Sequence, residues 1–280
     1  MKSIAILPLA VSGLASFALV GAAAAQPTWS GVYAGLNGGW NSWSNHVDPS
    51  QVTVNQLSGV NAGAGPVTVP PTTFSTFGVD NKGSSGTWGG QLGVNAQSGA
   101  LVFGVEGDLN ALYGARSQTS AFTLPATGLT TGSATTVTNY TDPHWMGSVR
   151  GRLGWAMGPL LLYGTGGVAF AGVREATGYG YAPAVTPAVT TANPGTTFGP
   201  YANGSSGDRT LTGWTVGGGA EWALSRHVSI GAEYRHSDFG HRTFVSGGGG
   251  PNQLSGASRM GFSDDEILAK VNYRFGGGLF

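Results

Sequence analysis

Three consecutive residues, His236, Ser237 and Asp238, carry the side-chain types of a hydrolase. A serine nucleophile needs a histidine base and an acid whose side chains converge on one point. Apolar and polar residues alternate along this segment, which indicates a β-strand, and adjacent strand residues point to opposite faces. His236 and Ser237 therefore cannot meet directly, and we expect no catalysis here.

The other histidines do not suggest a metal or haem site. His46, His144, His227 and His241 are scattered along the chain, and no two histidines have the spacing H-x-x-x-H. The chain has no cysteine, which excludes a thiol nucleophile, a disulfide bond and a thiolate-bound metal. We expect no metal and no cofactor.

Charged side chains are the second group of candidates, and they recur at two-residue spacing. In the segment SVRGRLGWAM, Arg150 and Arg152 alternate with Val149, Leu153 and Trp155. Nine charged residues lie on such polar edges: Glu106, Asp108, Arg150, Arg152, Glu221, Glu233, Arg235, Lys270 and Arg274. Four acids and five bases are nearly balanced, so we interpret them as an ion-paired network, although the sequence does not assign the pairs.

Eight segments with a period of two residues must position these charges. They lie near residues 31–41, 87–97, 101–112, 144–156, 160–173, 211–223, 228–238 and 266–275. Each has about the length of a strand that crosses a bilayer at a tilt, ~9–11 residues. An arginine that faces the bilayer midplane of a barrel costs ~2–4 kcal/mol, so the apolar edges, with Trp145, Val149, Leu153 and Trp155, should face lipid and the charges the interior.

The connections between the segments alternate between short and long. Tight turns are expected at 98–100, 157–159 and 225–227, whereas the gaps near 42–86, 113–143, 174–210 and 240–265 are long and rich in Gly, Ser, Thr, Asn and Pro. Outer-membrane barrels have short periplasmic turns and long extracellular loops. The sequence predicts an all-β, eight-stranded antiparallel transmembrane barrel with four long extracellular loops and both ends at the periplasmic side.

The composition favours this fold over a soluble β-sandwich or lipocalin-like barrel. Charged residues are 9% of the 280, against roughly 25% in an average soluble protein, which is too few to cover a soluble exterior. A closed eight-stranded lumen is just wide enough for side chains to fill. We therefore expect a plugged lumen and not an open channel. The formal net charge of zero offers no basic surface for nucleic acid.

The first residues have the three parts of a secretory signal peptide. A lysine at position 2 precedes an apolar run over 4–20, and small residues follow in GAAAAQP. Ala23 and Ala25 fit the cleavage rule, so we predict a signal peptide over residues 1–25 and a barrel domain over 26–280. Export through the general secretory route and location in the outer membrane follow.

Three segments resemble a known family: WSGVYAGLNGGW (29–40), EYRHSDFG (233–240) and AKVNYRFG (269–276). They are similar to the strand motifs of small outer-membrane immunogenic proteins, the porin-family or opacity-like eight-stranded barrels. The resemblance implies a surface-exposed structural or adhesive protein, in some members an antigen. His236 replaces the usual aromatic residue of the second motif. Either Phe275 or the terminal Phe280 resembles the signal that the barrel-assembly machinery reads.

We therefore expect a non-enzymatic, integral outer-membrane barrel that is structural and surface-exposed. A narrow porin for ions or small solutes is the alternative, and a lipid-modifying enzyme is a second alternative. The expected partners are outer-membrane lipid, the barrel-assembly machinery during insertion, and an unknown extracellular ligand of the long loops, because loops vary freely on a rigid scaffold.

Overall fold

The computed structural model describes residues 28–48, 51–54, 57–61, 65–69, 72–75, 79–113, 116–124, 133–182, 196–197, 201–247 and 254–275. The predicted signal peptide, its cleavage site and Phe280 lie outside the described residues, as do parts of the four long connections. No helix within the described ranges is long and apolar enough to cross a membrane.

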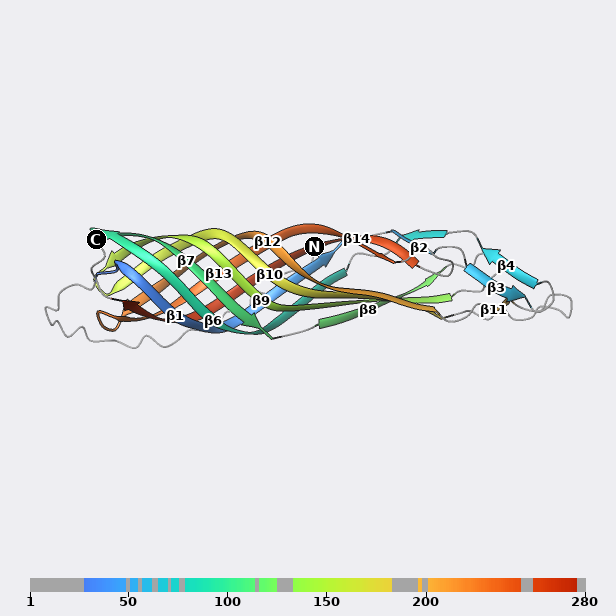
Figure 1. The fold of residues 1–280 in the computed structure, drawn as a ribbon, viewed down its shortest axis with the longest axis horizontal. Helices are drawn as coiled ribbons and strands as arrows, with labels where there is room; N and C mark the ends of the chain where they lie inside the picture. The colour runs from blue at the N-terminus through green and yellow to red at the C-terminus, as the bar shows by residue number, and fades with distance from the viewer. Residues whose placement is uncertain are drawn as a thin grey trace, which may run out of the picture.

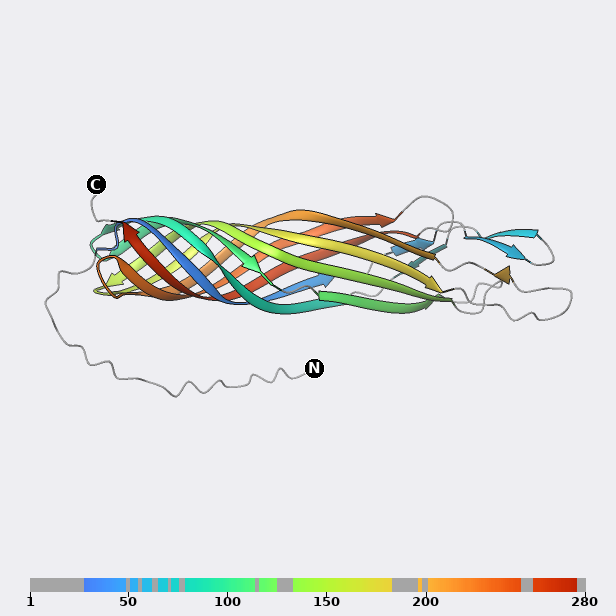
Figure 2. The same ribbon diagram turned by 60° about the horizontal axis from the view of Figure 1, so that its bottom comes forward.

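Eight long strands form the wall of a closed barrel (Figures 1 and 2). They are β1 (Gly31–Val47), β6 (Val79–Ser98), β7 (Leu101–Leu112), β9 (Ser133–Met157), β10 (Leu160–Ala182), β12 (Tyr201–Ala223), β13 (Val228–Gly247) and β14 (Leu254–Phe275). Each strand pairs antiparallel with the next in this order, and β1 pairs with β14, which closes the ring. The predicted eight-stranded antiparallel barrel is confirmed.

Tight turns gather at one end of the barrel. Gly99 and Gly158 begin the turns after β6 and β9, and both have positive φ angles, 62° and 61°, which glycine adopts without strain. The four residues 224–227 join β12 to β13. Val32 pairs with Phe275, so β1 begins and β14 ends at this same end. Short turns mark the periplasmic side of outer-membrane barrels. The first and last barrel strands therefore meet at the end with the short turns, as the sequence predicted.

At the opposite end the strands continue far beyond the predicted segments. The wall strand β9 starts at Ser133 and β10 runs to Ala182, although the sequence predicted long connections over 113–143 and 174–210. The bounds of the four connections were therefore wrong. These extensions are rich in Thr, Ser and Gly, because outside the bilayer a paired strand needs no apolar face toward lipid, and the apolar alternation stops there.

Short strands enlarge this extracellular part. They are β2 (Gln51–Val54), β3 (Leu57–Asn61), β4 (Gly65–Val69), β5 (Thr72–Ser75), β8 (Arg116–Leu124) and β11 (Thr196–Thr197). Strand β8 pairs with β9, β2 joins β14 to β5, and β3, β4 and β11 form a separate sheet that Figure 1 shows farthest from the barrel.

A bulge interrupts β13 where the wall leaves the membrane band. The register between β13 and β14 shifts between Asp238 and His241, and Gly240 has a φ angle of 65°. The pairing of β12 with β13 runs only from Trp214 to Ala223 on the β12 side. Bulges bend and twist a strand. Above this level β12 and β13 are therefore no longer neighbours in the ladder.

The outer face of the barrel is apolar, as the alternation predicted. On β9, Val149, Leu153 and Trp155 are 55–56% exposed, whereas Arg150 and Arg152 between them are buried. Trp145 and Trp155 stand ten residues apart, which is about 33 Å along a strand at ~3.3 Å per residue. At a tilt of roughly 40° this spans the ~25 Å apolar band between two aromatic girdles.

Candidate functional site: the lumen

The inner face of the barrel holds all nine charged residues that the sequence grouped. Eight of them have residue exposures of 5% or less, and the Asp108 side chain is 2% exposed. They come from β7, β9, β12, β13 and β14, and alternation along each strand turns them inward. The structure brings eight of them into direct ion pairs and leaves Arg274 apart at the periplasmic mouth, where its guanidinium lies 4.7 Å from the Trp29 ring and donates to the carbonyl oxygen of Thr28.

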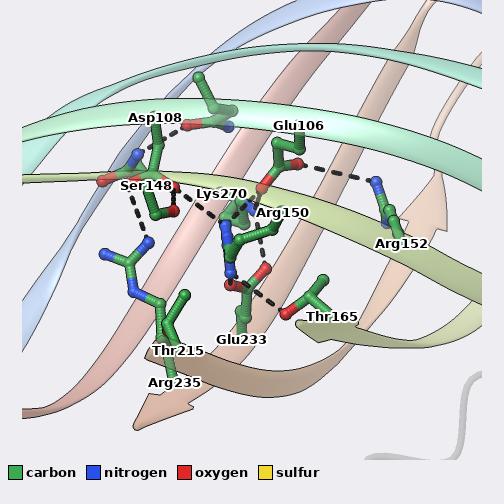
Figure 3. A network of polar contacts seen from close by, with 12 residues as sticks. Glu106, Asp108, Ser148, Arg150, Arg152, Thr165, Thr215, Glu233, Arg235 and Lys270 are labelled. Carbon is green, nitrogen blue, oxygen red and sulfur yellow. Dashed lines mark hydrogen bonds and ion pairs between the residues drawn. The ribbon is translucent and has the colours of Figure 1, made fainter. Parts of the chain in front are cut away.

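Two cations and two carboxylates form the centre of the network (Figure 3). Arg150 Nη2 lies 2.6 Å from Glu106 Oε1, and its Nη1 donates to Glu233. Lys270 Nζ donates to both carboxylates, at 2.7 Å each. Each carboxylate thus meets two cations, and the four side chains come from β7, β9, β13 and β14.

A second contact joins opposite walls of the barrel. Arg235 Nη1 on β13 lies 2.9 Å from Asp108 Oδ1 on β7. Four strand positions separate β7 from β13 in either direction around the eight-membered ring. These two side chains therefore cross the full diameter of the lumen. Asp108 also lies 3.1 Å from Arg150 Nη2 and accepts a hydrogen bond from Ser148.

The periplasmic part of the network is built on aromatic rings. Arg152 pairs with Glu221 at 2.6 Å, and its guanidinium lies 3.7 Å from the centre of the Tyr163 ring. The Tyr163 hydroxyl donates to Glu233 at 2.9 Å, and the Tyr33 hydroxyl donates to Glu106 at 2.7 Å. A cation on an aromatic face is favourable, more so when water is excluded.

Apolar layers enclose the network on both sides. The periplasmic layer consists of Trp29, Val102, Leu161, Tyr163 and Ala223. The extracellular layer consists of Trp43, Leu112, Met146, Ala169, Ala171, Val173, Leu211, Phe239 and Phe262. Two of its rings, Trp43 and Phe262, have centroids 6.2 Å apart. The charges therefore lie in a low-dielectric compartment, where an unpaired charge is costly and a paired one interacts strongly.

The outer membrane protein beta-barrel domain family matches residues 11–275 of the chain. The chain belongs to this family of outer-membrane β-barrels. It is 34% identical over 200 residues to the 31 kDa outer-membrane immunogenic protein of Brucella melitensis, an alignment that covers 67% of this chain and 71% of the relative. It is 26% identical over 190 residues to the 22 kDa outer membrane protein of Rhizobium leguminosarum, covering 67% and 66%.

Solved structures are more distant from this outer-membrane barrel. OprG of Pseudomonas aeruginosa aligns with a TM-score of 0.41 and 12% identity, over 89% of this chain and 97% of that one. The outer membrane protease OmpT of Escherichia coli aligns with a TM-score of 0.38 and 10% identity, over 88% and 97%. Likenesses this remote do not bear on activity.

Two members of the network were missed in the sequence. Asp264 and Glu266 on β14 are 1% and 0% exposed and face the lumen. Glu266 pairs with Arg235, and Asp264 accepts a hydrogen bond from Asn41 at 2.9 Å. The buried network therefore has six acids and five bases, where the sequence grouped four acids and five bases. Both acids share the even-numbered parity of Lys270: Glu266 already lies within the predicted segment 266–275, and extending the alternation by two residues would have found Asp264.

The segment considered for catalysis is divided between the two faces of this barrel wall. Ser237 is buried in the lumen and donates to Thr215 at 3.0 Å. His236 lies on the outer face, where its Nδ1 is 2.8 Å from Asp265 Oδ1, beside the Trp214 ring. Asp265 in turn accepts from the Tyr234 hydroxyl at 2.6 Å. The alternation thus places the candidate nucleophile and the candidate base on opposite faces of the wall. Within the described ranges, no group of three His, Asp or Glu side chains could hold a metal ion.

Proposed function

We propose that this outer-membrane barrel is a non-enzymatic, structural and surface-exposed protein whose lumen does not conduct. The transmembrane part is a closed barrel that anchors the protein, and the extracellular strands and connections provide the surface to which external partners bind. The name of the Brucella relative as an immunogenic protein agrees with exposure of such a surface. Loops on a rigid scaffold are the usual place for recognition.

The contact between Arg235 and Asp108 carries the proposal for a closed lumen. The two side chains join opposite walls at 2.9 Å, which leaves no axial path between them. The apolar layers on both sides add a second barrier, because an ion would have to leave water to enter them. A porin needs a hydrated path, whereas here eight of the charged side chains that the sequence grouped are held in direct ion pairs.

Separation of His236 from Ser237 supports the non-enzymatic part of the proposal. A lipid-modifying enzyme that used Ser237 would have to admit its substrate to the lumen. Ser237 is only 1% exposed there, and its hydroxyl donates a hydrogen bond to Thr215. Comparison of lipid A from cells that overproduce the wild type or Ser237→Ala tests this part. Identical lipid A is expected, and a wild-type product that the variant fails to make would contradict it.

Planar-bilayer recording tests the closed lumen. The purified wild type, with insertion verified by the heat-dependent shift of the folded band on a gel, is expected to give no steady current under conditions in which an open porin conducts. Arg174→Ala serves as the matched control, because that arginine pairs with Asp208 outside the lumen and is exposed. Steady wild-type channels whose conductance changes in Arg150→Ala but not in Arg174→Ala would show that the charges line a pore, and would refute the proposal.

A further inference from the structure

The lipid-facing wall of the barrel has a groove that is separate from the lumen. It has a volume of about 650 Å³ and lies over β1, β6, β7 and β9, which are neighbours in the ring (Figure 1). Its lining is Leu36, Trp88, Gly89, Gly90, Leu109, Asn110, Ala111 and Trp145. The volume falls in the range of small-ligand sites, ~300–1,000 Å³.

Strand register explains the shape of the groove. Trp88 on β6 pairs with Ala111 on β7, and Ala111 pairs with Trp145 on β9. Two indoles thus stand two strand spacings apart, about 10 Å, with a methyl group between them. One step toward the periplasm, Gly90 pairs with both Leu36 and Leu109, so the slot continues between two leucines over a glycine floor.

Packing within the chain does not require glycine at position 90. A Cβ placed there would lie 3.4 Å from the Gly35 carbonyl oxygen, which is ordinary van der Waals contact. Leu36 and Leu109 on either side are 72% and 62% exposed. The groove is therefore open toward the bilayer, and at Gly90 its floor carries no side chain.

The groove lies in the extracellular half of the membrane band and has polar groups at its outer end. Trp145 belongs to the girdle about 25 Å from the periplasmic Trp155. Tyr113 is two residues beyond the groove residue Ala111, just past the end of β7, and is 64% exposed. His144, also exposed, directly precedes Trp145. A phenol and an imidazole above an apolar slot match the two parts of an outer-leaflet lipid, a polar head and an acyl chain.

We propose that this groove binds an acyl chain of lipid A, the glycolipid of the outer leaflet. The chain lies between the Trp88 and Trp145 indoles over Ala111 and Gly90, and Tyr113 and His144 face sugar or phosphate oxygens. Hydrophobic transfer does not select this lipid, since the bilayer is equally apolar. Selection comes from close contact with rigid rings, which lipid tails alone do not provide. Lipid binding in this outer groove does not depend on whether the lumen conducts.

Lipid retention measured by native mass spectrometry tests the proposal. The full chain is reconstituted in nanodiscs of phosphatidylethanolamine with lipid A as a minor component, then extracted into detergent. Ala111→Phe fills the slot, and Ala232→Phe makes the same change on the outer face of β13. The wild type and Ala232→Phe should each retain one lipid A, and Ala111→Phe should retain about tenfold less, as expected for the loss of contact with two aromatic rings.

The double variant Trp88→Ala/Trp145→Ala removes the walls and should also lose lipid A, so the test does not depend on a single variant that folds. Folding of each variant is followed by its heat-dependent gel shift. Equal retention by the wild type and both groove variants would overturn the proposal. So would retention of phosphatidylethanolamine in proportion to its abundance, or a dimer mass that Ala111→Phe abolishes, which would assign the groove to a second copy of the chain.

Discussion

Substitution of Arg150 by alanine tests whether the lumen network stabilises the folded barrel. Arg150 contacts Glu106 at 2.6 Å, Asp108 at 3.1 Å and Glu233, and all three carboxylates are buried. Removal of one partner of a buried ion pair typically costs about 3–5 kcal/mol. Each carboxylate here keeps another cation, Lys270 or Arg235, so the lower end, about 3 kcal/mol, is expected.

Equilibrium unfolding in urea, with the barrel in lipid vesicles, measures this change. Tryptophan fluorescence and the heat-modifiable gel band should give the same midpoint for a two-state transition. The exposed Arg174→Ala control should leave the midpoint unchanged. A double-mutant cycle of Arg150→Ala with Glu233→Gln should give a coupling free energy above about 1 kcal/mol, because the two groups are in direct contact. Equal midpoints for the wild type and Arg150→Ala would refute the reasoning.

Three further substitutions test other parts of the structure by the same unfolding measurement. Val149→Arg puts a charge on the lipid-facing edge near the middle of the band and should destabilise the barrel by ~2–4 kcal/mol; no change would mean that this face is not in hydrocarbon. Asp264→Asn removes the sixth buried acid and keeps an acceptor for Asn41, so it should stabilise by about 1–2 kcal/mol, and destabilisation would contradict the surplus of acid. Gly93→Ala places a Cβ against the Tyr33 ring and should cost about 1–3 kcal/mol; a neutral result would show that the ring can move freely.

Alternation alone was sufficient to predict the membrane part of the fold. Along β9 it placed Val149, Leu153 and Trp155 on the lipid face and Arg150 and Arg152 in the lumen, which is the arrangement that the structure has. The constraint is strong because a shift of one residue would turn both arginines toward hydrocarbon. Individual ion pairs were not predictable, because contacts such as that of Arg235 with Asp108 depend on strand register around the whole ring.

The apolar core in the extracellular half of the lumen was not predicted, because apolar side chains there face inward instead of outward. Within the membrane band an apolar side chain faces outward, but Trp43, Phe239 and Phe262 face inward and fill the lumen. Outside lipid the exterior is wet, and the wall follows the rule of a soluble barrel, apolar inside. Phe239 keeps the odd-numbered parity of Arg235 and Ser237, so a two-residue count does turn it into the lumen, and the bulge at Gly240 shifts the register of β13 only beyond it.

The central salt bridges have an implication for how the molecule is assembled. Glu106 and Arg150 lie in the first part of the chain to be exported, whereas Glu233 and Lys270 lie near its C-terminal end. An intermediate that lacks the last two strands leaves Arg150 without Glu233 and Glu106 without Lys270, so both groups should stay hydrated. Dehydration of the lumen and docking of the β13–β14 hairpin should then occur in one step. Incomplete barrels would keep a hydrated interior and should be more accessible to proteases than the closed barrel.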